Sequence, residues 1–242
     1  AFELSSGRRP LIVNCGSGST VGEDWRRAGR ATPSHSTLCL DGFSSARLGP
    51  TLRMGPIERE RLDDVPQSVP IELSRASDGY RFEGGHDGYK STHGLTHARI
   101  LELTYDGRGI VGEDLLVALG DADKARFDGN LEDSRLSGIP FDIRFHLHPE
   151  VDAAIDMNGA AVSMALRSGE IWVFRFDAAC ELALEPSVFL EKGRLRPRAT
   201  KQIVLSARAM EYATRVRWSL AKAQETAIAV RDLVQDDATL LN

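Results

Sequence analysis

The chain has 242 residues, of which 42% are hydrophobic, and its formal net charge is −5. This composition is sufficient for one large hydrophobic core, and the acidic balance argues against a nucleic-acid-binding protein, which depends on basic groups that neutralise phosphates. No apolar run reaches the roughly 18 residues that a membrane-spanning helix requires, so no membrane span is predicted.

Three cysteines are present, at Cys15, Cys39 and Cys180. Their odd number and wide spacing indicate neither a disulfide framework nor a zinc ribbon, and we expect buried thiols on strands. The chain begins with Ala-Phe-Glu-Leu and shows no signal-peptide pattern, so no targeting signal is identified.

Near the start of the chain, short runs of apolar residues are separated by turn residues. Leu11-Ile12-Val13 is followed by Asn14 and a Gly/Ser-rich loop. Residues 36–40 alternate between apolar and polar and end at Asp41-Gly42, a dipeptide typical of tight turns. Both runs predict β-strands.

The middle of the chain predicts a hairpin and then a meander. Residues 98–105 and 109–117 flank Asp106-Gly107, which is the pattern of a β-hairpin. A meander of the strands 141–148, 151–157, 160–166 and 171–176 is expected, with the turn dipeptide Asn158-Gly159 at its centre. The strands expected from here to the end are 141–148, 151–157, 160–166, 171–176, 180–184, 187–190, 200–206 and 214–220.

Strand signals recur at short intervals without amphipathic helices between them, which argues against βαβ units. We therefore predict an all-β domain over residues 1–220, a two-sheet antiparallel β-sandwich. Two segments depart from the pattern. The charged residues 121–137 are expected to form a flexible surface loop, and residues 221–242 a short C-terminal helix or a disordered tail.

Asn14 and His35 lie at the end of one predicted strand and just before another. Neutral imidazole is a good zinc ligand, whereas a carboxamide oxygen is a poor one. From spacing alone, the pair indicates structural hydrogen bonding.

His146 and His148 form an H-x-H pair, and residues i and i+2 of a strand project from the same face. Such a pair can bind a metal in a jelly-roll enzyme, but Pro149-Glu150 follows at once, unlike the spacing in cupin barrels. We favour a polar pair that bonds locally or faces a partner domain.

His86 and Tyr89 flank a predicted turn, and His93 and His97 follow closely. Imidazole and aromatic groups near a turn can line a sugar cleft, and a turn with a packed tyrosine is the alternative. There is no G-x-S-x-G nucleophile motif and no phosphate-binding loop. No complete active site is evident.

Basic residues cluster at Arg26, Arg27 and Arg30, and again at residues 194–201. Clusters of this kind are usually solvated surface, and contact with a polyanion is the alternative.

Several segments together resemble the heparinase II/III family of polysaccharide lyases over nearly the whole chain to about Leu220. The most specific segment runs from Asn14 to Asp41 and contains Ala-Thr-Pro-Ser-His-Ser-Thr before an apolar strand and Asp-Gly. Supporting segments are Trp25-Arg26, Ser44-Ser45, His86-Asp87-Gly88-Tyr89, His97-Ala98-Arg99, 144–149 and 202–205.

The resemblance implies the C-terminal β-sandwich, of the super-sandwich type, of a carbon–oxygen lyase whose N-terminal α/α toroid completes a cleft. Such enzymes cleave uronate-containing polysaccharide, glycosaminoglycan or alginate-like, by β-elimination. The family's tyrosine base lies on the toroid, and a further histidine lies in an H-x-H motif that would precede Phe2. We therefore expect this chain alone to be inactive.

The resemblance also implies a possible metal. Some members bind zinc through the second histidine of that motif, a strand-end aspartate and a further histidine. The last two positions correspond to Asn14 and His35 here. The Asp-to-Asn difference removes a charged ligand, and the zinc would hold loops facing the cleft rather than activate water.

The expected partners are an acidic polysaccharide and the toroid of the parent protein, and the resemblance suggests the periplasm or cell envelope. The acidic net charge argues against a densely sulfated polymer. Two alternatives stay open: a non-catalytic carbohydrate-binding or assembly module, and a metal-dependent jelly-roll enzyme that uses His146 and His148.

Overall fold

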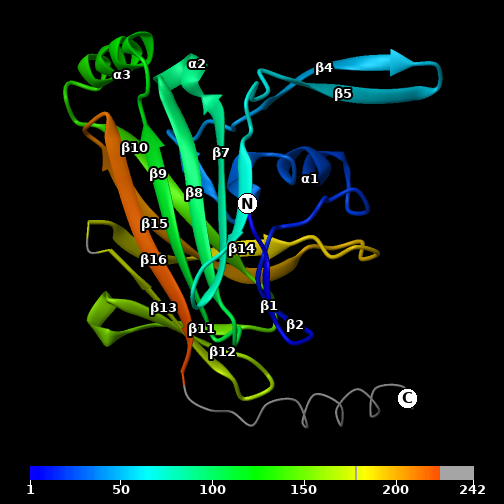
Figure 1. Ribbon diagram of the computed structural model, residues 1–242. Helices are drawn as coiled ribbons and strands as arrows, with labels where there is room; N and C mark the ends of the chain where they lie inside the picture. The colour runs from blue at the N-terminus through cyan, green and yellow to red at the C-terminus, as the bar shows by residue number, and fades with distance from the viewer. Residues whose placement is uncertain (178, 224–242) are drawn as a thin grey trace.

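The computed structural model describes residues 1–177 and 179–223, and two antiparallel sheets stack face to face around one core (Figure 1). The first sheet has the order β1 (Leu4–Ser6), β2 (Arg9–Val13), β10 (Ile139–Leu147), β15 (Arg198–Ala209), β14 (Glu181–Phe189), and β3 (Leu38–Leu40) also pairs with β10. The second has the order β11 (Asp152–Asp156), β12 (Ala161–Ala165), β13 (Ile171–Phe176), β16 (Ala213–Lys222), β9 (Gly109–Val117), β8 (Leu95–Thr104), β7 (Gly79–Tyr89), β6 (Ile71–Arg75).

The remaining elements lie outside the two sheets. A separate hairpin of β4 (Arg47–Met54) and β5 (Ile57–Asp63) projects away from the body of the domain (Figure 1). The helical elements are α1 (Glu23–Ala28), η1 (Thr32–Ser34), α2 (Lys90–His93), α3 (Asp121–Asp133) and η2 (Met157–Gly159). No helix among the described residues is long and apolar enough to cross a membrane. The two-sheet antiparallel sandwich is as predicted.

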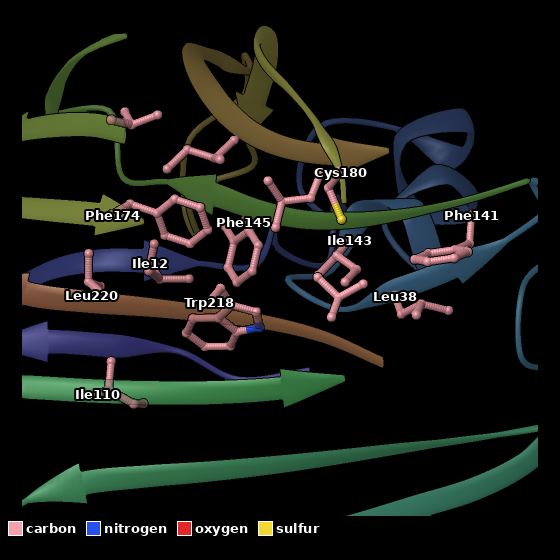
Figure 2. Packing of buried hydrophobic residues seen from close by; sticks show 14 of the residues in the cluster. Ile12, Leu38, Ile110, Phe141, Ile143, Phe145, Phe174, Cys180, Trp218 and Leu220 are labelled. Carbon is pink, nitrogen blue, oxygen red and sulfur yellow. The ribbon is translucent and has the colours of Figure 1, made fainter. Parts of the chain in front are cut away.

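The centre of the core is a cluster of aromatic rings contributed by both sheets (Figure 2). The ring of Phe145, from β10, lies 4.8 Å from that of Phe174 and 4.8 Å from that of Trp218, both in the second sheet. These side chains are almost completely buried. Large rings stabilise a sandwich strongly because each removes much apolar area from water.

One glycine is required for this packing. A Cβ atom added to Gly112 of β9 would lie 2.0 Å from the Trp218 ring. The absence of a side chain lets the indole lie against the backbone of β9.

The predicted hairpins and turns are confirmed. Strands β8 and β9 pair in antiparallel register, and β11, β12 and β13 form the predicted meander. Asn158 and Gly159 have φ angles of 56° and 92°, the left-handed conformation in which Asn and Gly are favoured. All three cysteines are buried and free.

Residues 121–137 were expected to form a flexible loop, and this prediction is wrong, because residues 121–133 form α3. The carboxylate of Asp123 accepts a hydrogen bond from the Gly120 amide, 3.2 Å away, and so caps the first turn. Only Phe127, with Leu131 one turn later, supplies an apolar face. Two apolar residues in a charged segment are too weak a pattern to be recognised as a helix.

Two strand assignments also differ in detail. Strand β10 was grouped with the meander but pairs with β2, β3 and β15 in the other sheet. Residues 181–189 form one strand rather than two, with Pro186 tolerated because β14 lies at a sheet edge. Strand β16 continues to Lys222, and the predicted helix or tail beyond residue 223 lies outside the described residues.

Candidate functional site

A buried carboxylate, Asp114, stands on the inner face of β9 where the strand pattern would place an apolar residue. Its Oδ1 accepts hydrogen bonds from His97 Nε2 (2.8 Å) and Arg99 Nε (2.8 Å). Its Oδ2 accepts from Arg99 Nη2 and Trp218 Nε1, both at 3.0 Å. Burial alone would raise the pKa of Asp114, but the Arg99 guanidinium and the His97 hydrogen bond lower it well below its usual range, so the carboxylate is ionised.

His86 extends this network toward the surface. Its Nε2 lies 3.3 Å from His97 Nδ1, and the Gly88 amide donates to its Nδ1 at 3.2 Å. Because His97 Nε2 donates to Asp114, its Nδ1 must accept the proton of His86 Nε2, and both rings are neutral. Burial, followed by the neighbouring His97, lowers the pKa of His86 to about 4. Each nitrogen of His86 is therefore engaged.

Ser36 joins this network to the residues singled out by the sequence. Its carbonyl oxygen accepts a hydrogen bond from Arg99 Nη1 at 2.8 Å, and its amide donates to Asn14 Oδ1 at 2.8 Å. Asn14 Nδ2 in turn donates to Glu3 Oε1 at 3.0 Å. A continuous chain of polar contacts thus runs from His86, through the sandwich interior, to Glu3 at the surface.

His35 lies directly beside Ser36, at the end of η1, and is half-buried. Burial lowers the pKa of its imidazole, while Glu3 favours the charged form. Asn14 and His35, 21 positions apart, are thus brought to one place by Ser36.

These residues do not fit a zinc ion by themselves. Asn14 is neutral, and both its polar atoms are hydrogen-bonded to Ser36 and Glu3. Within residues 1–177 and 179–223, no three or more His, Cys, Asp or Glu side chains gather closely enough to hold a metal. Zinc stays a prediction of the resemblance.

The two histidines of the H-x-H pair, His146 and His148, differ in burial and in their hydrogen-bond partners. His146 is 3% exposed, and its Nε2 donates to the Pro33 carbonyl at 2.9 Å. Its Nδ1 therefore accepts, and Ser187 Oγ lies 2.8 Å away, with Cys15 Sγ at 3.4 Å. Burial raises the pKa of the Cys15 thiol, so this group is no activated Cys–His nucleophile.

His148 and Tyr89 have structural contacts of different kinds. His148 is half-buried, packs its ring 5.2 Å from that of Phe189, and accepts the Glu150 amide at Nδ1. Tyr89 is fully buried and donates its hydroxyl to the Leu38 carbonyl at 3.1 Å. Neither Tyr89 nor His146 lies on an open surface of the described chain.

Asp114 and Trp218 were not predicted from the sequence as members of the site. A signal for Asp114 is present: in 109–117 it occupies the same alternating face as Ile110 and Leu116. A charged residue on a buried face requires a buried partner. Trp218 lies 104 positions away, and no local pattern connects the two.

The buried histidines predict acid sensitivity. Burial lowers the pKa of His146 from 6.5 to about 4. Between these pH values the unfolded chain binds a proton at His146 that the folded chain does not. The free energy of unfolding should therefore fall as the pH drops from 6.5 to 4, by on the order of 2–3 kcal/mol for this group. Urea unfolding of the wild type and His146→Gln at pH 7.5 and 5 measures it. An equally steep pH dependence in the variant would contradict the assignment to His146.

Comparisons with known proteins bear on the whole domain. The model of a family described as heparinase II/III-like, C-terminal, matches residues 1–219. FtsZ-localized protein C of Caulobacter vibrioides is 32% identical over 234 residues, which cover 93% of this chain and 37% of that protein.

Solved structures share the fold. A heparan sulfate lyase HepC mutant from Pedobacter heparinus matches with a TM-score of 0.67 and 13% identity over 93% of this chain and 30% of its own. A heparinase III with methylated lysines matches with a TM-score of 0.65 and 13% identity over 94% of this chain and 30% of its own. The chain thus spans about a third of the length of the proteins it matches.

Proposed function

The chain belongs to the heparinase II/III-like C-terminal family, and from this membership we propose that it forms one wall of an acidic-polysaccharide cleft in a longer, lyase-related protein. The reaction proposed for the longer protein is β-elimination in a uronate-containing polysaccharide. In this proposal the chemistry belongs to a second domain, and this chain alone is catalytically silent.

The observation that carries this proposal is the saturation of the polar network. Both nitrogens of His86 are engaged, and His97, Arg99 and Asp114 are buried and bonded to one another. A general base needs a free lone pair within reach of the proton that it removes. The network supports a structural role instead, because it fixes the backbone at Ser36, and hence the position of His35 and Asn14 at the surface.

An uncovered apolar stripe favours a second domain. Ile71 and Leu73 of β6 are 67% and 72% exposed. In the register of the sheet, Ile71 lies opposite Gly84 and Leu73 lies opposite Phe82, both in β7. This face of the sheet also carries Arg99 of β8 and, toward the centre of the sheet, the side chains of the core. An inner sheet face with exposed aliphatic side chains at its edge is typical of a surface that another structure covers.

In the proposed reaction, a base of the second domain removes the proton from C5 of the uronate. The electron pair forms the C4=C5 double bond as the C4–O bond breaks, and an acid protonates the departing oxygen. The side chains of this domain would bind and orient the polymer and exclude water.

The test is the ultraviolet absorbance of the unsaturated product. We expect none when this chain alone is incubated with alginate, hyaluronan or heparan sulfate, and product when the longer protein is supplied with its polymer. Turnover by this chain alone would contradict the assignment of the base to a second domain. Absence of product from the longer protein with every uronate polymer would contradict the lyase assignment.

A second candidate function is that of an assembly module, and one comparison favours it. The relative that is 32% identical over 93% of this chain is named for its localisation with FtsZ. If this domain acts in the same way, a fluorescent fusion should co-localise with FtsZ and disperse when FtsZ is depleted. A distribution that does not follow FtsZ would contradict this candidate.

A further inference from the structure

A surface pocket of about 430 Å³ lies between α1, the turn after β3 and the base of the β4–β5 hairpin. Figure 1 shows α1 directly below this hairpin. Three arginines line the pocket, Arg27, Arg30 and Arg47, together with Asp41 and Phe43 from the turn after β3. It is separate from the network of His86 and Asp114.

Two of these arginines are held in place by ion pairs. Arg27 pairs with the buried carboxylate of Glu60 in β5, which also binds Arg26 at 2.8 Å. Arg47 pairs with Asp64 at the end of the hairpin. A guanidinium carries five N–H donors, and each of these pairs uses only part of them. The side chains of Arg27 and Arg47 are 53% and 56% exposed, so their remaining donors are open to a ligand.

Arg30 differs from these two. It is exposed and has no ion pair or side-chain hydrogen bond within the described part of the chain. Arg27 and Arg47 are each held by a carboxylate, whereas Arg30 supplies the guanidinium whose donors are all available to a ligand. Planar guanidinium groups bind carboxylate and sulfate with two parallel hydrogen bonds.

The other lining residues favour a hydroxylated ligand with an apolar face. Phe43 is 40% exposed, and its ring is supported edge-on by His93, 5.1 Å away. An exposed aromatic ring can stack on the apolar face of a pyranose. The Asp41 carboxylate is exposed and can accept hydrogen bonds from sugar hydroxyls.

We propose that this pocket is a subsite for one carboxylate-bearing sugar residue, with Arg30 as its principal anion contact and Phe43 as its stacking surface. The inference rests on the proposed polysaccharide function and assigns it a place on this domain. The carboxylate of the sugar binds Arg30, assisted by the free donors of Arg27 and Arg47, and the ring lies against Phe43.

The probe is a tetrasaccharide of mannuronate, and the control ligand is the same tetrasaccharide with its carboxyl groups reduced to alcohols. Dissociation constants are measured by calorimetry on the full chain. We expect binding of the acidic probe only, weakened about fivefold or more by Arg30→Ala and partly restored in Arg30→Lys. The matched control is Arg175→Ala, which removes an exposed arginine of β13 that also has no partner within residues 1–177 and 179–223.

Three results would overturn the proposal that this pocket is a sugar subsite. They are equal effects of Arg30→Ala and Arg175→Ala, equal affinity for the acidic and reduced probes, and no binding of either. None of these decides the polysaccharide function itself, because product formation by the longer protein is measured separately. Circular dichroism of each variant verifies that a loss of binding is not a loss of fold.

Discussion

Replacement of Asp114 by alanine is expected to lower the free energy of unfolding by about 3–5 kcal/mol, as found when one member of a buried ion pair is removed. The carboxylate is fully buried and accepts four hydrogen bonds, from His97, Arg99 and Trp218. Without it, the Arg99 guanidinium is left in the interior with one remaining side-chain hydrogen bond, to the Ser36 carbonyl. Urea unfolding at pH 7.5 measures the change.

The matched control is Glu113→Ala, one position earlier on the outer face of β9. Glu113 pairs with Arg217 at 2.8 Å and Arg215 at 3.9 Å, both more than half exposed, and such surface pairs contribute at most about 1 kcal/mol. Equal losses in the two variants would show that Asp114 is not the centre of a buried network. Asp114→Asn should lie between them, since it keeps acceptor capacity but removes the charge.

Replacement of Phe145 by alanine should cost a similar amount, about 3–5 kcal/mol. The ring is fully buried between Phe174 and Trp218, at 4.8 Å from each (Figure 2). Its removal leaves a cavity between the two sheets that these rings cannot fill without moving Trp218 away from Asp114. The measurement is again urea unfolding, with the slope of the transition compared to the wild type.

Phe43→Ala is the matched control for this change. Phe43 is 40% exposed and outside the core cluster, so its truncation should cost less than about 1 kcal/mol. If Phe145→Ala were no more harmful than Phe43→Ala, the aromatic cluster would not be what joins the two sheets.

Local pattern was sufficient for much of the fold. The alternation in residues 98–105 and 109–117, and the Asn158-Gly159 turn, gave strands and turns at the correct places because period-two burial and left-handed turn residues are local properties. The α3 helix was missed because only Phe127 and Leu131 give it an apolar face. The sheet to which β10 belongs was also missed, since its partner β15 is decided by contacts distant in sequence.

The candidate site was predictable only in part. The segment that resembles the family predicted Asn14 and His35 as site residues. In the structure both lie next to Ser36, which follows His35 in the chain and donates its amide hydrogen to Asn14. The sequence could not show that His86 has no free nitrogen, because this follows from a chain of bonds ending at Asp114. The sequence also could not show that His146 is buried while His148 is half-buried, because strand periodicity places both side chains on one face. The segment that covers His146, at Pro33, is remote in sequence.

In the proposed function, the face carrying Asn14 and His35 lies against a second domain that performs the chemistry. Amide hydrogen exchange tests this arrangement most directly, by comparing this chain alone with the same chain inside the proposed longer protein. We predict slower exchange in the longer protein at residues 1–6, 34–37 and 84–88, and unchanged exchange in β12 and β13. The same exchange rates at 34–37 and 84–88 in both proteins would contradict the account.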